Sequence, residues 1–329
     1  MKKVSAILLC LIFLCGCSIS EHRADFFAMN TIMQITAYGD APTDEAKAMI
    51  VSLEKQLSVT DSDSDISRIN TAGGKAVSVG ADTAELIKGA LKLCERTNGA
   101  LDITIYPVLR EWGFTTDEYR IPAEGRLAEL SDYVDFRAVE ITESGVSVPE
   151  GFMLDLGAVA KGYASDKTLT LLKENGAKSA LINLGGNVYA LGKKPDGSAW
   201  KIGIADPLEP NTICGRISLT NKSAVTSGSY ERYFIGEDGV KYCHIIDPAN
   251  LRPADSGLAS VTIVAESGLL CDALSTAMFV MGKQAALEHW RTYRDFEMVL
   301  IETDGKITVT DGLEGVFEPV GERDYEVAR

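Results

Sequence analysis

Hydrophobic residues recur at helical spacing in four parts of the chain. The clearest pattern spans residues 43–57, where apolar residues return every three or four positions. Thr43 or Asp44 is placed to cap the N-terminus of this helix. Three further helices are predicted at residues 82–97, 158–174 and 269–281. The last of these is strongly apolar, which is typical of a helix buried in the core.

Short apolar or alternating runs between these helices predict β-strands. Phe26–Tyr38 alternates and is predicted as one strand that ends at Gly39-Asp40, and residues 101–106 are β-like up to Pro107. Residues 187–264 read mostly as short strands separated by turn residues. Further strands are predicted at residues 152–154, 179–183, 298–302 and 306–310. This mixture, without repeats or an internal linker, predicts an α+β protein.

The N-terminus is predicted to be a targeting segment and not part of the fold. Lys2 and Lys3 precede a short apolar stretch that is not long enough for a membrane-spanning helix, so residues 1–16 are interpreted as a secretory signal. Leu14-Cys15-Gly16-Cys17 resembles a bacterial lipobox, which implies cleavage before Cys17 and lipid on that cysteine. Plain signal cleavage nearby is the alternative.

A lipidated Cys17 implies an exported protein attached to the bacterial cell membrane and facing the periplasm or the cell exterior. Residues 17–24 are then expected to be a tether, and residues 25–329 the folded domain. Outside the signal, four cysteines are scattered without a C-x-x-C pair, so neither a zinc site nor a redox pair is indicated. Cys94 and Cys271 lie in apolar helical patterns and are predicted to be core residues.

The composition excludes several classes of protein. With 46% hydrophobic and 24% charged residues among 329, the chain is neither disordered, collagen-like nor a coiled coil. A formal charge of −15 argues against nucleic acid as a partner, because such binding requires a clustered basic surface. An acidic protein that binds a phosphorylated ligand usually recruits a cation or directs backbone amides at the ligand.

Two segments carry acidic residues where they could act on a ligand. Asp155 stands just before the predicted helix at residues 158–174, whose free N–H groups suit an anion, and Lys161 could add positive charge. An ordinary helix-capping aspartate is the alternative. Asp61, Asp63 and Asp65 resemble the start of a calcium loop but lack its glycine and glutamate, so a solvated loop is predicted.

The apolar helix at residues 269–281 contains polar residues on one side. Asp272 and Thr276 are four residues apart and share a face, with Ser275 beside them. A carboxylate buried there needs a partner, which could be Mg²⁺ or a neighbouring loop that the aspartate caps. His244 precedes Ile245-Ile246-Asp247-Pro248; taken alone, it fits a structural histidine better than a base.

Together the segments resemble the ApbE-type FAD:protein FMN transferases in their order along the chain. The resemblance rests on Met29-Asn30-Thr31, Asp63–Asn70, Gly99–Thr104, Trp112-Gly113-Phe114, Asp155–Tyr163, Asn183–Asn187, Thr226–Tyr230, His244–Pro248 with Arg252-Pro253, and Asp272–Thr276. It implies an ApbE-like fold of mixed and antiparallel sheets flanked by helices, with the active site in a central cleft.

The resemblance also implies roles for individual residues. Asp272 and Thr276 would hold Mg²⁺, with oxygens from Ala158 and Ser275. His244 would be the base that accepts the acceptor's hydroxyl proton, since such work requires a group titrating near neutrality, and Asp247 is the reserve candidate. The residues expected to line the FAD site are Met29, Ala100, Leu101, Asp102, Asp155, Lys161 and Ile246.

The implied reaction moves FMN from FAD onto a threonine or serine hydroxyl of a partner flavoprotein, for example a subunit of a membrane redox complex, and releases AMP. A Mg²⁺-dependent FAD pyrophosphatase that yields FMN and AMP is the second hypothesis, and a non-catalytic FAD-binding lipoprotein the third. Two positions depart from the family pattern: Asn30 replaces a glycine, and Thr60 stands where an aromatic residue is usual. We expect the lost ring to weaken FAD retention and to favour attack by water.

Overall fold

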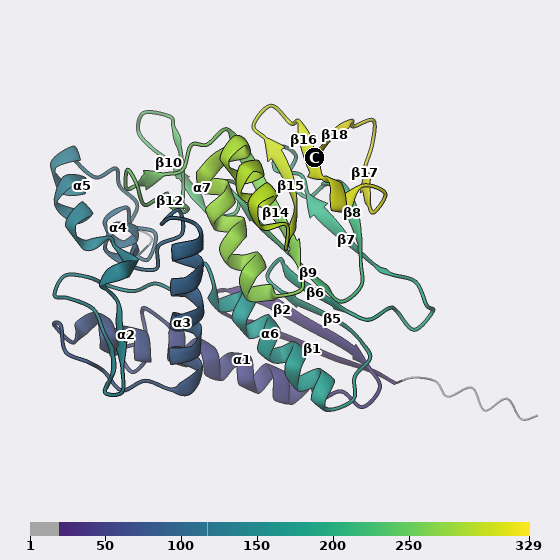
Figure 1. Cartoon of the computed structure of the whole chain (residues 1–329), viewed down its shortest axis with the longest axis horizontal. Coiled ribbons are helices and arrows are strands. Elements are labelled where there is room, and N and C mark those ends of the chain that lie inside the picture. Colours follow the sequence, from purple (N-terminus) through teal and green to yellow (C-terminus); the bar gives the residue numbers. More distant parts are fainter. Residues whose placement is uncertain (1–19, 117) are drawn as a thin grey trace, which may run out of the picture.

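The computed structural model describes residues 20–116 and 118–329, and its centre is one large sheet (Figure 1). All neighbouring strands in it are antiparallel except the last pair, β16 and β18. In spatial order the strands are β1 (Glu21–Ala28), β2 (Thr31–Tyr38), β5 (Ser179–Leu184), β6 (Asn187–Leu191), β9 (Lys222–Gly228), β14 (Leu258–Ala265), β15 (Glu297–Glu302), β16 (Ile307–Thr310) and β18 (Tyr325–Ala328).

Helices cover one face of this sheet, and a small sheet covers part of the other. The helices are α1 (Thr43–Leu57), α2 (Asp65–Thr71), α3 (Ala81–Arg96), α4 (Tyr106–Glu111), α5 (Glu124–Leu130), α6 (Ala160–Glu174) and α7 (Gly268–Tyr293). Figure 1 shows α1, α6 and α7 across the sheet, with α6 packed between the other two. This layer holds the main apolar core, and the predicted α+β architecture of helix-flanked mixed and antiparallel sheets is confirmed.

The opposite face carries a second apolar cluster beneath a three-stranded sheet. That cluster includes Trp200, Ile217, Val264 and Val299. The small sheet consists of β7 (Trp200–Ala205), β8 (Ile213–Leu219) and β17 (Phe317–Pro319). The central strands are therefore covered on both faces, and all eight residues of β14 are buried.

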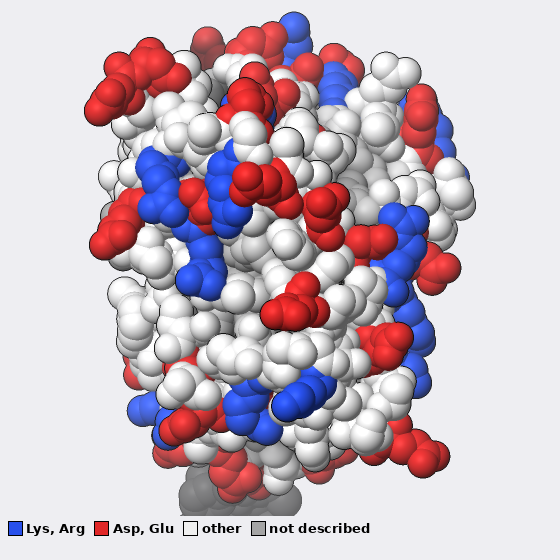
Figure 2. All heavy atoms as spheres, turned by 90° about the vertical axis from the view of Figure 1, so that its left-hand side faces the viewer, with Lys and Arg blue, Asp and Glu red and all other residues white. Residues whose placement is uncertain are grey.

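Short hairpins and helices form the rim of the molecule. The hairpins are β3 (Glu140–Thr142) with β4 (Gly145–Ser147), β10 (Tyr233–Ile235) with β11 (Lys241–Cys243), and β12 (Ile246–Asp247) with β13 (Arg252–Pro253). A third apolar cluster joins α4 and α5 to the last of these through Trp112 and Leu251. Acidic and basic side chains are interspersed on the face that Figure 2 shows.

The four predicted helices are present, although their ends differ. α1 has Pro42 at its N-cap, so Thr43 and Asp44 lie in its first turn, and the predicted capping is wrong. α7 continues to Tyr293, but Gly282 has non-helical backbone angles and kinks it where the predicted helix ends. Cys94 and Cys271 are buried in the core as predicted, and the four cysteines of the described segment are free thiols.

The predicted single strand at Phe26–Tyr38 is instead the hairpin β1–β2. Ala28 pairs with Thr31, and both intervening residues, Met29 and Asn30, have positive φ angles of 48° and 60°. Positive φ at both central positions defines the tight turn that matches strand twist, and asparagine tolerates it better than most residues. Asn30 therefore occupies a backbone conformation that suits glycine as well.

Two other short β-like runs do not form ladders. Residues 101–106 and 152–154 share only one isolated bridge, between Ile105 and Met153. The Asp102 carboxylate accepts hydrogen bonds from the Thr104 amide and hydroxyl at 2.8 and 2.6 Å, which curls the backbone into a turn. Periodicity alone does not detect such side-chain to backbone bonding.

The acidic loop before α2 is only partly solvated, so this prediction is wrong for Asp65. Its carboxylate accepts hydrogen bonds from the Gly80 amide at 2.8 Å and the Thr83 hydroxyl at 2.6 Å, and pairs with Arg68. Asp61 and Asp63 are exposed, as predicted. A buried carboxylate with three partners ties α2 to the start of α3.

The predicted signal at residues 1–16 and the lipidation site Cys17 lie outside the described residues. β1 begins at Glu21 and pairs along its whole length with β2, so residues 21–24 belong to the sheet and not to a tether. Within residues 20–116 and 118–329, no helix is long and apolar enough to cross a bilayer.

Candidate active site

The site is built where α6 crosses the first turns of α7. A Cβ added at Gly162 would lie 2.3 Å from the Gly268 carbonyl oxygen and 2.7 Å from the Asp272 Cβ, so the two helices meet backbone to backbone. Asp166 of α6 accepts hydrogen bonds from the amides of Gly268 and Leu269, which caps the start of α7. This close crossing places Asp272 directly against the first turn of α6.

Asp272 is a buried carboxylate with no direct ion pair in the described residues. It is 4% exposed, and its Oδ2 accepts a hydrogen bond from the Gly162 amide at 2.8 Å. Among residues 20–116 and 118–329 it forms no salt bridge, and burial raises the pKa of this carboxyl. The hydrogen bond from the Gly162 amide agrees with the alternative that Asp272 caps a neighbouring segment. Oxygen atoms of other groups also surround the Asp272 carboxylate, and a cap does not require these.

The Ala158 carbonyl provides one of these oxygen atoms. It lies one helical turn before Gly162, and in a regular helix it would accept the amide of that residue. That amide is bound to Asp272 instead, so the Ala158 carbonyl oxygen has no hydrogen-bond partner in the described part of the chain. Its placement favours the predicted role as an oxygen ligand.

Hydroxyl groups provide the other oxygens. Ser275 and Thr276 follow Asp272 on α7, and the Ser227 hydroxyl of β9 lies 2.8 and 3.4 Å from their respective Oγ atoms. Ser275 is buried and Thr276 is partly exposed. The three predicted side-chain ligands thus lie on one face of α7, as their spacing indicates.

Lys161 supplies positive charge at the centre of the site. It interacts electrostatically with the carboxylates of Asp155 and Asp272, where it lowers both pKa values against the effect of burial. It also lowers the pKa of Glu231, which burial and Asp272 nevertheless raise to about 7. Lys161 depresses the pKa of His244 as well. One ammonium group therefore faces residues from four separate segments.

Asp155 joins this centre to the loop after α3. Its backbone amide donates to the Ile103 carbonyl at 2.8 Å, and its carboxylate accepts from the Gly157 amide at 2.6 Å. The N-cap of α6 is Val159, so the alternative that Asp155 caps this helix is wrong. The loop is held in turn by Asp102, whose Oδ2 accepts from the Phe136 amide at 3.0 Å.

His244 follows the β10–β11 hairpin and is hydrogen-bonded to the Arg232 carbonyl. The Arg232 carbonyl accepts the His244 backbone amide at 3.0 Å and lies 3.1 Å from its Nδ1. A carbonyl can only accept, so Nδ1 carries the proton and Nε2 has the free lone pair. Burial beside Phe114, with Arg232 and Lys161 nearby, lowers the pKa of His244 to about 4. The assumption that it titrates near neutrality is therefore wrong, and the ring is neutral at physiological pH.

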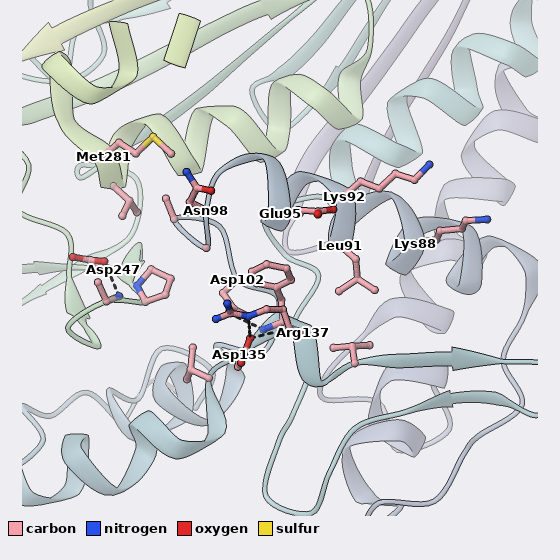
Figure 3. A pocket seen from close by; sticks show the side chains of 18 residues that line it. Lys88, Leu91, Lys92, Glu95, Asn98, Asp102, Asp135, Arg137, Asp247 and Met281 are labelled. Atoms are coloured by element: carbon pink, nitrogen blue, oxygen red, sulfur yellow. Dashed lines mark hydrogen bonds and ion pairs between the residues drawn. The ribbon is translucent and has the colours of Figure 1, made fainter. Parts of the chain in front are cut away.

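A cavity borders this site without containing its charged centre. It has a volume of about 1030 Å³ and is walled by α3, the loop after it, residues 134–139, the kink of α7 and residues 247–249. Figure 3 shows Asp102, Asp135 and Arg137 together in this cavity, with Asp247 on one side. Of the predicted FAD residues, Ala100 and Asp102 line it, whereas Asp155 and Lys161 do not. The predicted metal ligand Asp272 does not line it either.

The remaining predicted FAD residues come from other elements. Met29 lies in the β1–β2 turn, and its amide donates to the Glu54 carboxylate at 2.6 Å. Leu101 is buried in the main core and Ile246 in the third apolar cluster. None of these three residues lines the cavity.

Three polar residues of the site have no role in the predictions. Ser227 and Asn187 belong to segments that carry the family resemblance, but only the tertiary structure places them against α7 and α6. Glu231 directly follows the segment Thr226–Tyr230, and nothing in its spacing indicates that it faces Lys161. No group of three or more histidine, cysteine or acidic side chains forms a metal cluster in the described residues, so the predicted ligand set combines the single carboxylate of Asp272 with hydroxyl and carbonyl oxygens.

The arrangement defines an α+β protein with a polar, charged site where two helices cross beside a sheet. The ApbE family model matches residues 29–300, and the chain belongs to this family. A Treponema pallidum protein named FAD:protein FMN transferase is 32% identical over 93% of this chain and 92% of its own length. The crystal structure of the ApbE protein of Thermotoga maritima superposes with a TM-score of 0.83 at 30% identity, covering 90% of this chain and 99% of that one.

A second solved structure supports the fold assignment. The flavinyl transferase ApbE of Pseudomonas stutzeri, in its apo form, has a TM-score of 0.81 at 28% identity and covers 91% of this chain and 97% of its own. The ApbE-like fold predicted from the ordered motifs is therefore confirmed.

The crossing of α6 and α7 can be tested at Gly162. Gly162→Ala places a methyl group against the Gly268 carbonyl and should lower the free energy of unfolding by about 1–3 kcal/mol, because neither backbone can yield without moving Asp272. Urea denaturation measures this change. Gly125→Ala on α5 is the matched control, since no atom lies within 4 Å of its new Cβ. Equal stability of the two variants would contradict the proposed constraint.

Proposed function

We infer that this chain is an FAD:protein FMN transferase, and we propose that it uses Mg²⁺ held at Asp272. The transferase activity follows from membership of the ApbE family and from the names of relatives that span most of the chain. The observation that carries the metal proposal is the buried Asp272 carboxylate, which forms no salt bridge in the described chain and has the hydroxyl groups of Ser275 and Thr276 on the same helix face.

These oxygen groups fit Mg²⁺ by their chemistry. A hard cation prefers carboxylate, hydroxyl and carbonyl oxygens, and it leaves positions for substrate phosphates. Asp272, Thr276 and the Ala158 carbonyl would hold the ion, with Ser275 beside them. When bound, the ion would neutralise negative charge on the FAD diphosphate as the P–O bond breaks.

The side chains of the site would divide the remaining work. Lys161 directs its charge at the diphosphate, and Asp155 holds the loop that ends in Ile103. The acceptor's hydroxyl oxygen attacks the FMN-side phosphorus, the bond to the AMP phosphate breaks, and AMP leaves. His244 accepts the hydroxyl proton at Nε2, because its Nδ1 proton is bound to the Arg232 carbonyl. The product is FMN joined to the acceptor by a phosphoester.

The acceptor is proposed to be a flavoprotein with a target threonine or serine, such as a subunit of a membrane redox complex. Export and lipidation at Cys17 would place the enzyme at the membrane surface, outside the cytoplasm. The support for this placement is the apolar segment and lipobox-like residues of the N-terminus. A search for a diacylglyceryl-modified Cys17 by mass spectrometry of the membrane fraction tests it.

The decisive assay incubates the full-length chain, purified in detergent, with FAD, MgCl₂ and an acceptor domain that carries the target threonine. We expect AMP release that requires Mg²⁺, with FMN covalently bound to the threonine. Asp272→Ala should reduce the rate by at least about a hundredfold, because it removes the carboxylate ligand. Chromatography of AMP and mass spectrometry of the acceptor measure both products.

Each alternative function has its own outcome in this assay. AMP with only free FMN, whether or not acceptor is present, would identify a pyrophosphatase. FAD that stays intact and bound would identify a flavin-binding protein without catalysis. An acceptor with its threonine replaced by alanine is the control for covalent transfer.

The protonation state of His244 gives a pH prediction. Its pKa of about 4 in the free enzyme means that Nε2 can accept a proton above that pH and loses this ability below it. The profile of kcat/KM should therefore be flat between about pH 5.5 and 8 as far as this residue is concerned, and fall only in more acidic solution. An inflection near 6.5 that disappears in His244→Gln would contradict the assignment.

The absent ring at Thr60 gives a binding prediction. Thr60 is exposed, with its amide bonded to the Ser58 hydroxyl at 3.2 Å, so a larger side chain can be accommodated. Thr60→Tyr should tighten FAD binding about fivefold, equivalent to about 1 kcal/mol from a flat stacking surface. Fluorescence titration of FAD in EDTA measures this without turnover. Thr60→Leu is the control, because it adds bulk without a ring. Equal FAD affinities for Thr60→Tyr and wild type would contradict the hypothesis.

A further inference from the structure

Asn187 is a buried amide whose hydrogen-bonding capacity is not filled by the described residues. It is 1% exposed, and neither Oδ1 nor Nδ2 forms a hydrogen bond of regular distance and angle with a described residue, although its amide interacts with the Asp272 carboxylate. A side-chain amide offers two donors and an acceptor, and burying one with these groups unpaired is costly. Such a group in the centre of a sheet requires an explanation.

The sheet register shows which way this side chain faces. Asn187 opens β6 and lies directly opposite Val225 of β9. Ser227 is two residues further along β9 and so projects from the same face, where its hydroxyl contacts Ser275 of α7. Asn187 therefore points into the layer between the sheet and helices α6 and α7, both of which pack against β6.

The polar group with which the Asn187 amide interacts is the Asp272 carboxylate. Asn187 lowers the pKa of Asp272, which means that its amide stabilises the ionised form. The carboxylate already accepts the Gly162 amide, and the backbone amide of Lys161 also stabilises it. Asn187 thus faces the same oxygens from the sheet side, opposite the first turn of α6.

We propose that Asn187 is a positioning residue of the cation site, with its amide satisfied when a hydrated divalent ion is bound. Nδ2 would donate to the Asp272 carboxylate and fix its orientation, and Oδ1 would be available to accept a hydrogen bond from water held with the ion. This inference rests on the proposed Mg²⁺ site and adds to it a residue from the sheet. It explains why an amide, and not an apolar side chain, occupies a buried position here.

Other buried polar groups without partners differ from Asn187 in kind. Thr308 on β16 is also buried and unpaired among the described residues, but it is a single hydroxyl. β16 is separated from β9 by two strands, so Thr308 lies away from Asp272. Thr308→Val is therefore a matched control, because it removes an unpaired polar group that lies away from the proposed cation site.

The test compares metal-free stability with metal affinity. Asn187→Leu keeps the size of the side chain and removes its polar atoms, so the melting temperature in EDTA should be unchanged or higher. Calorimetric titration with MgCl₂ of the full-length chain in detergent should show a Kd raised about ten- to hundredfold. Thr308→Val should leave the Kd unchanged. If Asn187→Leu does not fold, Asn187→Ala replaces it in the same titration.

The outcomes separate this inference from the function on which it rests. Wild type that binds Mg²⁺ through Asp272, together with an Asn187→Leu variant of equal affinity, overturns only the role of Asn187. Wild type and Asp272→Ala that bind Mg²⁺ alike remove the cation site, and the inference with it. A variant that loses stability in EDTA but keeps its Mg²⁺ affinity would show that Asn187 is structural.

Discussion

The contact between α6 and α7 is the constraint on which the site depends. Two glycines bring the helix backbones together, and Asp166 and Asp272 each accept amides across the crossing. Because the Gly162 amide donates to Asp272, the first turn of α6 is left open at the Ala158 carbonyl. One interaction thus buries a carboxylate and frees a carbonyl oxygen beside it. Both are groups that a hard cation prefers.

Charge in the site is controlled by burial more than by ion pairing. The chain is strongly acidic, yet one ammonium group, that of Lys161, faces several carboxyl groups from different segments. Removal from water raises the pKa values of those carboxyls, so their ionised forms are costly without nearby positive charge. The same physical effect acts in the opposite direction on His244 and keeps it neutral, so that its Nε2 lone pair is available at physiological pH although the ring is a weaker base than a free imidazole.

The residues of the site come from two parts of the molecule, the helix layer packed on the sheet and the rim of short hairpins. Asp272 and Lys161 belong to helices packed on the sheet, whereas His244 is carried by a short hairpin that aromatic side chains such as Phe114 and Phe234 support. Small hairpins make few buried contacts and open at lower free energy than a central sheet. We therefore interpret the rim as the part that admits substrate and acceptor, and the helix layer as the part that holds phosphate.

The sequence alone determined the helices, many of the strands and the shared face of Asp272, Ser275 and Thr276, because these depend on periods of two and 3.6 residues. The ordered motifs also indicated the family. Only the tertiary structure decided that Phe26–Tyr38 turns at Met29-Asn30, that Asp65 is buried, and that His244 titrates far below neutrality. It alone brought Asn187 and Glu231 to the site. The burial of a residue and its charged neighbours depend on segments distant in sequence, and local sequence patterns do not reveal them.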